Sequence, residues 1–420
     1  MVDQPADAPG TGVVDAAGAS GVNGAVDPAE AADGAEVRLF GTAATVAACC
    51  CFVLLGALQA YYGPAIPALR TRFGLAPSGA GLALSMFYGG AVTGVLVGGV
   101  AHRRLSNSRL LIGSFLVMAL GALGFALAPA WPAALAASLV AGFGAGGMDY
   151  GLNQLFAVGF GRRSPAMLSI LNAHYGVGAI CGPVVISRLG GDNYPAAFAG
   201  TAVLLVASCW FFRDVRDEPE HDASTGEEPA GGSTARAGRT ALLVIGAFLA
   251  LYALQVAVET GIGAWEPTYL QLLGHGTAFA ANATSGFWLM LTVGRFLVAP
   301  LTLRWSEPAI VWVSCLGTTL CLGLAIDPAL APYALAGAGL FNAPVFPAAL
   351  PWLNRVTRAR WAGTGAILTA NIGGAAAGPL LGLGIEVFGS GSVPWSLTVV
   401  SAVCLVLALW LRAAARPAPA

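Results

Sequence analysis

A series of long apolar segments constrains this chain more than any other feature, because about 20 consecutive apolar residues can cross a lipid bilayer as a helix. The predicted spans form two blocks of six: residues 40–62, 79–101, 110–128, 132–156, 167–189 and 195–212, then 240–265, 280–303, 308–326, 330–351, 362–388 and 393–411. Only 10% of the residues are charged, against about 25% in a soluble domain. The sequence therefore predicts an all-α polytopic membrane protein with 12 transmembrane helices in two six-helix bundles.

Polar segments divide the chain into five parts. Residues 1–38 hold seven acids and one Arg, and they lack the basic start and apolar core of a secretory signal. We expect a disordered cytoplasmic tail there. An N-terminal six-helix bundle at 39–212, a cytoplasmic linker at 213–239, a C-terminal six-helix bundle at 240–412 and a cytoplasmic tail at 413–420 follow it.

The distribution of arginine predicts on which side of the membrane the termini lie. An even number of spans places both termini on one side, and short cytoplasmic loops are rich in basic residues. With the termini inside, the short outer loops hold only Arg70, Arg72 and Arg188. The short inner loops then hold nine: Arg103, Arg104, Arg109, Arg162, Arg163, Arg304, Arg355, Arg358 and Arg360. We therefore expect an N-in, C-in topology.

Composition excludes several classes of function. All 20 basic residues are Arg, so lysine chemistry such as a Schiff base is excluded. A net charge of −1 argues against a nucleic-acid partner. The eight cysteines form no CxxC or Cys/His cluster, so we predict no metal, no disulfide framework and no cofactor. The abundance of Ala and Gly suggests a GC-rich bacterial genome, and we expect a monomer in the bacterial cytoplasmic membrane.

The two blocks resemble each other. Ser85-x-Phe87-Tyr88, ending at Gly94, recurs 200 residues later as Ser285-x-Phe287-Trp288, ending at Gly294. Gly-Pro pairs at 182–183 and 378–379 close the glycine-rich stretches of the fifth and eleventh spans. Six-plus-six repeats are typical of secondary transporters, which bind substrate near the midplane between the halves. Chance similarity between Ala/Gly-rich helices is the alternative.

Asp149 is the sharpest candidate for a functional residue. It lies on the fourth span in a glycine-rich run, and Asn153 follows one turn later on the same face. A charged side chain at the bilayer centre costs about 2.5–3.5 kcal/mol, and this span holds no Arg to neutralise it. Such a carboxyl group can take up and release a proton. We interpret Asp149 as a proton-coupling residue, the alternative being an acid that only locks two helices together.

Glu259, on the seventh span, is the second candidate for ion coupling. Gln255 lies one turn before it on the same face. Counted from the span ends, Glu259 lies in the outer third and Arg295 near the inner end of the eighth span. The two are then about 15 Å apart in depth, too far for an ion pair. We expect a bound cation or substrate to meet the charge of Glu259 instead.

The residues that follow Glu259 predict a broken helix beside a water-filled cavity. Gly261, Gly263 and Pro267 weaken and interrupt the span, which the membrane tolerates only beside protein or water. Trp265 and Tyr269 near this break suit a polyhydroxylated ligand, which needs hydrogen bonds and an apolar ring face. Alternatively, these two side chains belong to an aromatic belt at the outer interface.

Other polar residues within spans would line a cavity if they faced one axis. The further candidates for substrate binding are Asn172, His174, Trp288, Asn342 and Asn371. Each Asn or His could equally join two helices by hydrogen bonds. Arg295 either extends to the interface or forms part of an inner gate. Gln59, Tyr61 and Tyr62 are open to both the lining and the belt interpretation.

Four stretches resemble the major facilitator superfamily, and within it the fucose/glucose–galactose permease group. They are Gly144-x-Gly146-x-x-Asp149-x-x-x-Asn153, Leu171-Asn172-x-His174-Tyr175-Gly176, the spacing of Glu259, Trp265 and Tyr269, and Phe346-Pro347 with Gly373-Gly374 and Gly378-Pro379. The resemblance implies proton- or sodium-coupled sugar uptake by alternating access, with Asp149 in the proton relay and binding site.

The chain departs from the resembled pattern at two positions. Fucose-type members have a second acid late in the first span, where this chain has Gly63 ahead of Pro67. The loop after the second span usually reads G-x-x-x-D-R, and here His102 replaces the Asp before Arg103. We expect His102, Arg103 and Arg295 to take part in gating.

Three hypotheses for function follow. The first is symport of a small polar solute, a sugar or polyol, with protons or sodium. The second is an efflux carrier for a drug or secondary metabolite on the same fold, against which the Asn, Gln and His residues argue. The third, a membrane enzyme, finds no support, because the sequence holds no HExxH and no Gly-x-Ser-x-Gly motif.

Overall fold

Long helices make up the part of the chain that the structure describes. The computed structural model describes residues 39, 41–102, 104–217, 239–357 and 361–414, and these described residues belong to one compact unit. Within the described residues, 12 helices are long and apolar enough to cross a membrane. Helices are the expected solution, because every backbone polar group in lipid must find its partner within the segment. The predicted all-helical fold class is therefore confirmed.

The first six spans come from the N-terminal half of the chain. They are α2 (Thr42–Phe73), α3 (Pro77–Ala101), α4 (Asn107–Leu127), α5 (Trp131–Gly159), α6 (Ser164–Leu189) and α7 (Tyr194–Ser208), the last extended by the 3₁₀ helix η3 (Cys209–Phe212). Two short 3₁₀ helices, η1 (Gly161–Arg163) and η2 (Gly191–Asn193), precede α6 and α7. Glycine at a left-handed position ends α2, where the N–H of Gly74 (φ 63°) donates to the Arg70 carbonyl.

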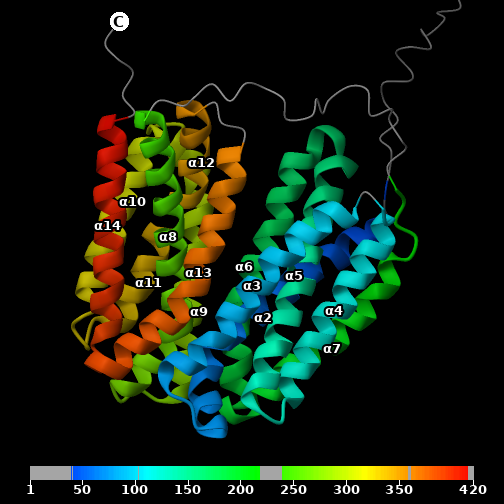
Figure 1. Cartoon of the computed structure of the whole chain (residues 1–420), viewed down its shortest axis with the longest axis horizontal. Helices are drawn as coiled ribbons and strands as arrows, with labels where there is room; N and C mark the ends of the chain where they lie inside the picture. Colours follow the sequence, from blue (N-terminus) through cyan, green and yellow to red (C-terminus); the bar gives the residue numbers. More distant parts are fainter. Residues whose placement is uncertain (1–38, 40, 103, 218–238, 358–360, 415–420) are drawn as a thin grey trace, which may run out of the picture. The chain divides into compact units, whose positions relative to one another are not determined.

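The second six spans come from the C-terminal half. They are α8 (Arg239–Leu272), α9 (Thr277–Thr302), α10 (Glu307–Leu324), the pair α11 (Ala331–Asn342) and α12 (Val345–Val356), α13 (Trp361–Phe388) and α14 (Ser392–Ala414). In Figure 1, α2–α7 gather on one side and α8–α14 on the other. We call the side where α2 begins and α14 ends the terminal side, and the other the opposite side.

The predicted break in the seventh span is wrong. Helix α8 runs without interruption through Gly261, Gly263 and Pro267 to Leu272. A proline removes one backbone donor, and neighbouring helices let a membrane helix tolerate that loss. The interruption lies instead in the tenth span, where Ala343 and Pro344 form a turn between α11 and α12. Likewise α2 extends to Phe73, past the predicted end at residue 62, with two prolines inside it.

Glycines bring the helices of each half close together. A Cβ atom on Gly142 of α5 would lie 2.0 Å from the Phe87 carbonyl oxygen of α3. The repeat noted in the sequence has a matching role in both halves. A Cβ on Gly94 would lie 2.1 Å from the carbonyl oxygen of Phe143 on α5, and one on Gly294 would lie 2.4 Å from that of Leu340 on α11. The second span thus approaches the fourth as the eighth approaches the tenth.

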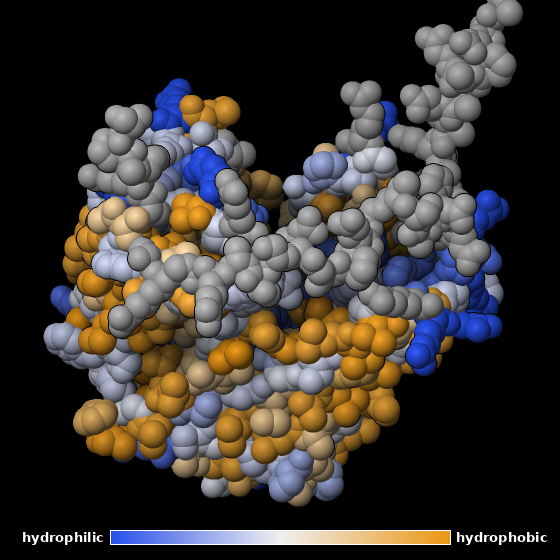
Figure 2. Space-filling view, turned by 45° about the horizontal axis from the view of Figure 1, so that its top comes forward, coloured by the Kyte–Doolittle hydropathy of each residue, from blue (hydrophilic) through white to orange (hydrophobic). Residues whose placement is uncertain are grey.

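The outer faces of the helices are apolar. Leu120, Val203, Leu380 and Val406 are each more than half exposed, and they belong to four different spans. Figure 2 shows apolar side chains covering much of the surface below the terminal side. Apolar side chains exposed on so many helices suit contact with lipid.

Most of the packing between the two halves comes from three helix pairs: α2 with α8, α3 with α13 and α6 with α9. These pairs follow the repeat, since the first span meets the seventh, the second meets the eleventh and the fifth meets the eighth. A two-fold relation between the six-helix units produces this pattern, because it maps the second span onto the eighth and the eleventh onto the fifth. A site between the halves is therefore built from corresponding elements of both.

Candidate functional site

A central cavity of about 730 Å³ lies between the two halves. Residues of α2, α3, α5 and α6 line it from one half, and residues of α8, α9 and α13 from the other. Its wall includes Leu96, Ala157 and Leu168, which lie near the ends of their helices on the terminal side. Figure 2 shows the molecule hollowed between the two halves on that side. The cavity therefore extends from the middle of the molecule toward the terminal side.

Asp149 belongs to a chain of amide hydrogen bonds on the N-terminal wall. The Asn153 side-chain amide donates to Asp149 Oδ1 and to the Asp149 carbonyl, both at 2.9 Å. Asn172 of α6 donates in turn to Asn153 Oδ1 at 3.2 Å. All three residues line the cavity. Among the described residues, no cationic side chain forms a salt bridge with Asp149.

Glu259 faces the cavity from the C-terminal half and is paired there. Arg295 of α9 donates to Glu259 Oε1 at 3.0 Å, and Gln255 donates to Oε2 at 3.2 Å. The Arg295 side chain is 41% exposed and that of Glu259 14%, so the guanidinium group is the more open to the cavity. The sequence-based expectation that these two residues lie too far apart for an ion pair is wrong.

Helix register explains this error. Gly263 of α8 packs against the Trp288 ring of α9, where its Cβ would lie 2.9 Å from Cζ2. The two helices run in opposite directions, so the residue one turn before Gly263 faces the residue one turn after Trp288. That places Glu259 level with Thr292, and Arg295 lies about 4.5 Å further along. A long arginine side chain spans that gap. Depths counted from the predicted span ends missed this, because the sequence does not show how α8 and α9 are aligned along their axes.

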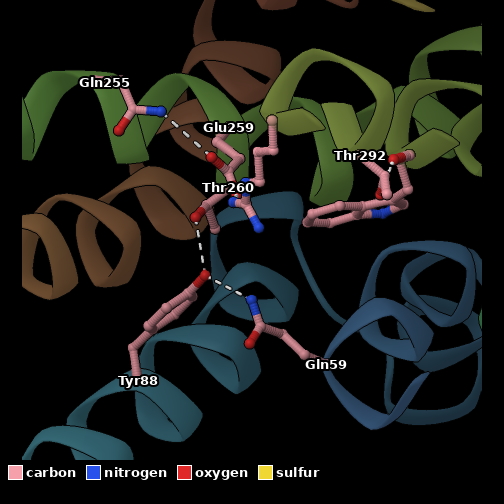
Figure 3. A network of polar contacts seen from close by, with 8 residues as sticks. Gln59, Tyr88, Gln255, Glu259, Thr260 and Thr292 are labelled. Atoms are coloured by element: carbon pink, nitrogen blue, oxygen red, sulfur yellow. Dashed lines mark hydrogen bonds and ion pairs between the residues drawn. The ribbon is translucent and has the colours of Figure 1, made fainter. Parts of the chain in front are cut away.

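A second hydrogen-bonded group links the halves in the middle of the molecule. The Gln59 amide of α2 donates to the Tyr88 hydroxyl of α3 at 2.8 Å, and this hydroxyl lies 3.0 Å from Thr260 Oγ1 of α8. Figure 3 shows Tyr88 and Gln59 pointing toward Thr260, beside the contact of Gln255 with Glu259. Sequence reasoning noted Tyr88 only as part of the repeat, although a tyrosine within a span needs a partner for its hydroxyl.

The opposite side of the cavity is closed by contacts between the halves, which we call the seam. A Cβ on Gly63 of α2 would lie 2.1 Å from the Gly263 carbonyl oxygen, and one on Gly81 of α3 would lie 2.4 Å from that of Gly378. Hydrogen bonds cross the seam from Ser85 to the Ala375 carbonyl, from the Ser78 N–H to Glu386 at 2.6 Å, and from Ser187 to the Ala278 carbonyl at 3.3 Å. The site is thus open on one side and shut on the other.

Six of the residues selected from the sequence lie in the cavity wall. They are Asp149, Asn153, Asn172, Glu259, Arg295 and Asn371. Gln59, for which lining was one of two interpretations, and Tyr175, which belongs to the motif of the fifth span, lie in the wall as well. Four further polar side chains of the wall were not among the candidates: Tyr88, Tyr150, Gln154 and Thr364. Tyr150, Gln154 and Thr364 lie on helices that also carry selected residues, whereas Tyr88 lies on α3, and only the packing shows which helix face turns inward.

Trp265 and Tyr269 lie outside the cavity wall. Trp265 is fully buried and its indole N–H donates to the Gly378 carbonyl of α13 at 2.9 Å. The Tyr269 hydroxyl donates to the Ala325 carbonyl after α10 at 3.0 Å. Both residues join α8 to neighbouring segments, so neither the predicted sugar contact nor the aromatic belt describes them.

Four other selected residues are also absent from the wall of the central cavity. Gln255 and Asn342 are buried at 2% and 3% exposure, Trp288 lines only a small separate void, and His174 Nδ1 lies 2.7 Å from the Ile170 carbonyl of its own helix. Gln255 still contributes to the site indirectly, because it holds Glu259.

The predicted gating pair is described only in part. His102 follows α3 on the terminal side and its ring packs edge-on against Tyr150, with centroids 6.2 Å apart. Arg103 lies outside the described residues, as do Arg358 and Arg360, the tail 1–38 and most of the linker and C-terminal tail.

Within the described part of the chain, no cluster of three His, Cys, Asp or Glu side chains could hold a metal ion.

Comparison with known proteins gives one family and a shared fold. The sequence model of the Major Facilitator Superfamily matches residues 48–370. No protein in the curated set matches the sequence. Among solved structures, a D-xylose–proton symporter superposes with a TM-score of 0.71 at 14% identity, over 88% of this chain and 96% of that one.

Two further solved structures share the fold. The nucleoside transporter NupG superposes with a TM-score of 0.69 at 15% identity, over 89% of this chain and 98% of that one. A bacterial homologue of the human lysosomal transporter Spinster, in an inward-facing and unoccupied conformation, gives 0.70 at 13% identity, over 90% and 98%. At such identities the likeness concerns the fold alone.

Proposed function

Because this chain belongs to the Major Facilitator Superfamily, we propose that it is a secondary active transporter for a small polar solute, a sugar or polyol, coupled to protons or sodium. The observation that carries the proposal is the central cavity, which both halves line, open toward the terminal side and closed at the seam. Alternating access requires such a geometry, in which a rocking motion of the halves exposes one site to each side in turn.

The polar groups of the cavity support a hydroxylated solute. Gln59, Asn153, Asn172 and Asn371 offer amide donors and acceptors on opposite walls. Amides both donate and accept, which matches the dual character of a hydroxyl group. Two aromatic residues, Phe87 and Tyr88, also line the cavity. This combination of a few placed polar groups with aromatic surface is typical of small-molecule sites.

Coupling is proposed to rest on Asp149 and Glu259. Asp149 meets only amide donors among the described residues, so its charge changes without breaking an ion pair. Glu259 is held by Arg295, so a cation or a solute hydroxyl must compete with the guanidinium group. Asp149 is therefore the proposed proton carrier, and Glu259 with Arg295 the pair that responds to the bound solute.

The fucose/glucose–galactose permease group stays part of the proposal, as do the bacterial cytoplasmic membrane, the N-in topology and a monomeric state. Support for the group comes from its motifs in α5 and α6, where Asp149, Asn153 and Asn172 stand together. With N-in topology the structure is inward-open, because the cavity extends toward the terminal side.

Counterflow in proteoliposomes tests this function. Vesicles are loaded with one unlabelled compound from a panel of hexoses, pentoses, their 6-deoxy forms and polyols, and uptake of the same labelled compound is measured. We expect at least one member to exchange, and the exchange to be lost in Asn172→Leu. Absence of exchange for the whole panel, in vesicles shown to contain folded protein, would contradict a sugar or polyol substrate.

One feature favours the efflux alternative. Val92, Val95 and Leu96 of α3 face the cavity together with Ile367 and Leu368 of α13, forming an apolar stretch of wall. An amphipathic drug or secondary metabolite would bind there. Export of a lipophilic cation dye from cells, faster than in cells carrying Asp149→Asn, would support this alternative over symport.

A further inference from the structure

Glu266 is a buried acid that the central cavity does not use. It lies seven residues beyond Glu259 on α8, which is about 10 Å along the axis and within about 20° on the helix face. The side chain is 1% exposed. Neither carboxylate oxygen has a hydrogen-bond partner within the described part of the chain.

The surroundings of Glu266 offer one hydroxyl group and no charged partner among the described residues. Thr284 of α9 faces the carboxyl group, but its hydroxyl donates to the Ala280 carbonyl at 3.3 Å. No ionisable side chain among the described residues interacts with it. The charged or titratable groups on the elements around it are engaged elsewhere or lie beyond it: Glu259 with Arg295, Asp327 beside Tyr269, His275 after α8, and Glu386 with Arg70. A buried charge without a partner is among the most costly groups in a protein, so this carboxyl group is neutral here.

Glu266 lies one helical turn beyond a residue of the seam. Gly263, one turn before it, contacts Gly63 of the other half. A void of about 10 Å³ sits at this contact, lined by both glycines, Tyr88 and Trp288, and the Trp288 indole N–H has no partner among the described residues. A void of that size holds at most one water molecule. Separation of α2 from α8 would widen it and let bulk water approach Glu266.

We propose that Glu266 is a proton-binding site that controls closure of the seam. With the seam open, water hydrates the Glu266 carboxylate, which can then be ionised and can bind one proton from the solvent. With the seam closed, as in this structure, only the carboxylic acid is tolerated, so the proton is bound before the halves close and leaves to water after they part. The inference rests on the proposed alternating access, but its test requires no solute.

The sign of the pH dependence follows from this linkage. Acid favours the closed seam through Glu266, since closure then binds a proton. Above the pH at which Glu266 titrates in the open state, the closed-to-open ratio falls by up to about tenfold per pH unit. Glu386 acts in the opposite direction, because its ionised carboxylate accepts the Ser78 N–H across the seam. The two acids therefore shift the closed-to-open ratio in opposite directions as pH rises.

Paired spin labels can measure closure directly. Labels at Ser187→Cys and Ala278→Cys stand on α6 and α9, which a hydrogen bond joins across the seam. The exposed Cys50 and Cys181 are replaced by Ser in this background. Dipolar broadening is recorded from acid to alkaline pH in proteoliposomes without added solute. We expect the broadening to weaken as pH rises.

Substitutions at Glu266 and Glu307 show which carboxyl group causes the pH response of the seam. Glu266→Gln, which is neutral and of the same size, and Glu266→Met, which is apolar and of similar length, should abolish the opening of the seam with rising pH; any response left to Glu386 has the opposite sign. Glu307→Gln, which removes an acid paired with Arg355 at the terminal-side end of α10, should keep the response of the parent protein. The proposal is overturned if the broadening in the parent protein does not weaken as pH rises, or if the same weakening survives in both Glu266 variants, whatever the counterflow experiment shows.

Discussion

Asp149 and Glu259 differ at the residue scale in how their charge is met. Asn153 donates to one oxygen of Asp149, whereas Glu259 receives a guanidinium group on one oxygen and an amide on the other. A proton can therefore bind Asp149 at the loss of little more than one amide contact. Protonation of Glu259 would also break its ion pair with Arg295 and leave the guanidinium group unpaired in the cavity.

Asp149→Asn tests the role of this acid. The amide keeps the shape and can still accept the Asn153 bond, but it cannot titrate. We expect pH-driven accumulation of the solute to be lost while exchange continues at a similar rate, measured in the same proteoliposomes with and without a pH gradient. Loss of both activities from well-folded protein would indicate a structural role, and unchanged accumulation would remove Asp149 from coupling.

Trp265 is expected to act on stability instead of on binding. Its buried ring and the hydrogen bond to the Gly378 carbonyl join α8 to α13. Replacing a buried Trp by Ala typically costs about 3–5 kcal/mol of unfolding free energy. Trp265→Ala should therefore unfold at lower temperature in detergent, whereas solute affinity of the folded fraction stays unchanged. A weakened affinity at unchanged stability would return Trp265 to the binding site.

At the scale of elements, the seam depends on close backbone approach. Gly63→Ala would place a methyl group 2.1 Å from the Gly263 carbonyl oxygen, and backbone atoms cannot yield as a flexible side chain would. We expect the transport rate to fall at least tenfold, with helical content unchanged in circular dichroism. Gly113→Ala is the matched control, because nothing lies within 4 Å of its Cβ on an exposed face of α4. Normal transport by Gly63→Ala would show that the seam can close with a wider gap.

The elements themselves were largely predictable, since apolar length and lipid chemistry determine them. All 12 spans overlap the predicted ones, and the errors fall on prolines. The first span was predicted to end at residue 62, just before Pro64, and Pro267 was taken as a break, although α2 and α8 continue through these prolines. Pro344, in contrast, lies in the turn that interrupts the tenth span. Whether a proline interrupts a membrane helix depends on neighbouring helices that compensate for the lost backbone hydrogen bond. A single sequence does not show which helices are neighbours.

The candidate site was predictable only in part, for a related reason. Asp149, Asn153 and Asn172 share a helix face or a motif, so local spacing identified them. The pairing of Glu259 with Arg295 depends on the register between α8 and α9, which the Gly263–Trp288 contact sets. Tyr88 meets Thr260 across the two halves, 172 residues away in sequence. Contacts of this kind follow from packing and not from composition.

At the scale of the whole molecule, orientation in the membrane decides what the open cavity means. Ten described arginines lie in or next to the helix ends of the terminal side, against Arg70, Arg72 and Arg188 on the opposite side. The ten are Arg104, Arg109, Arg162, Arg163, Arg213, Arg216, Arg239, Arg304, Arg355 and Arg412. Basic residues near span ends are retained in the cytoplasm, so the terminal side is expected to face inward. The cavity would then release its solute into the cell in this conformation.

Two single cysteines test this orientation in a background without the exposed Cys50 and Cys181. A membrane-impermeant maleimide applied to intact cells should not label Ser224→Cys in the linker, but should label it in inverted vesicles. Gly391→Cys, in the turn between α13 and α14 on the opposite side, should show the reverse pattern. Six spans on each side of the linker would place both termini and the linker on the same side of the membrane. Labelling of Ser224→Cys from outside in intact cells would invert the topology, and the cavity would then open to the exterior.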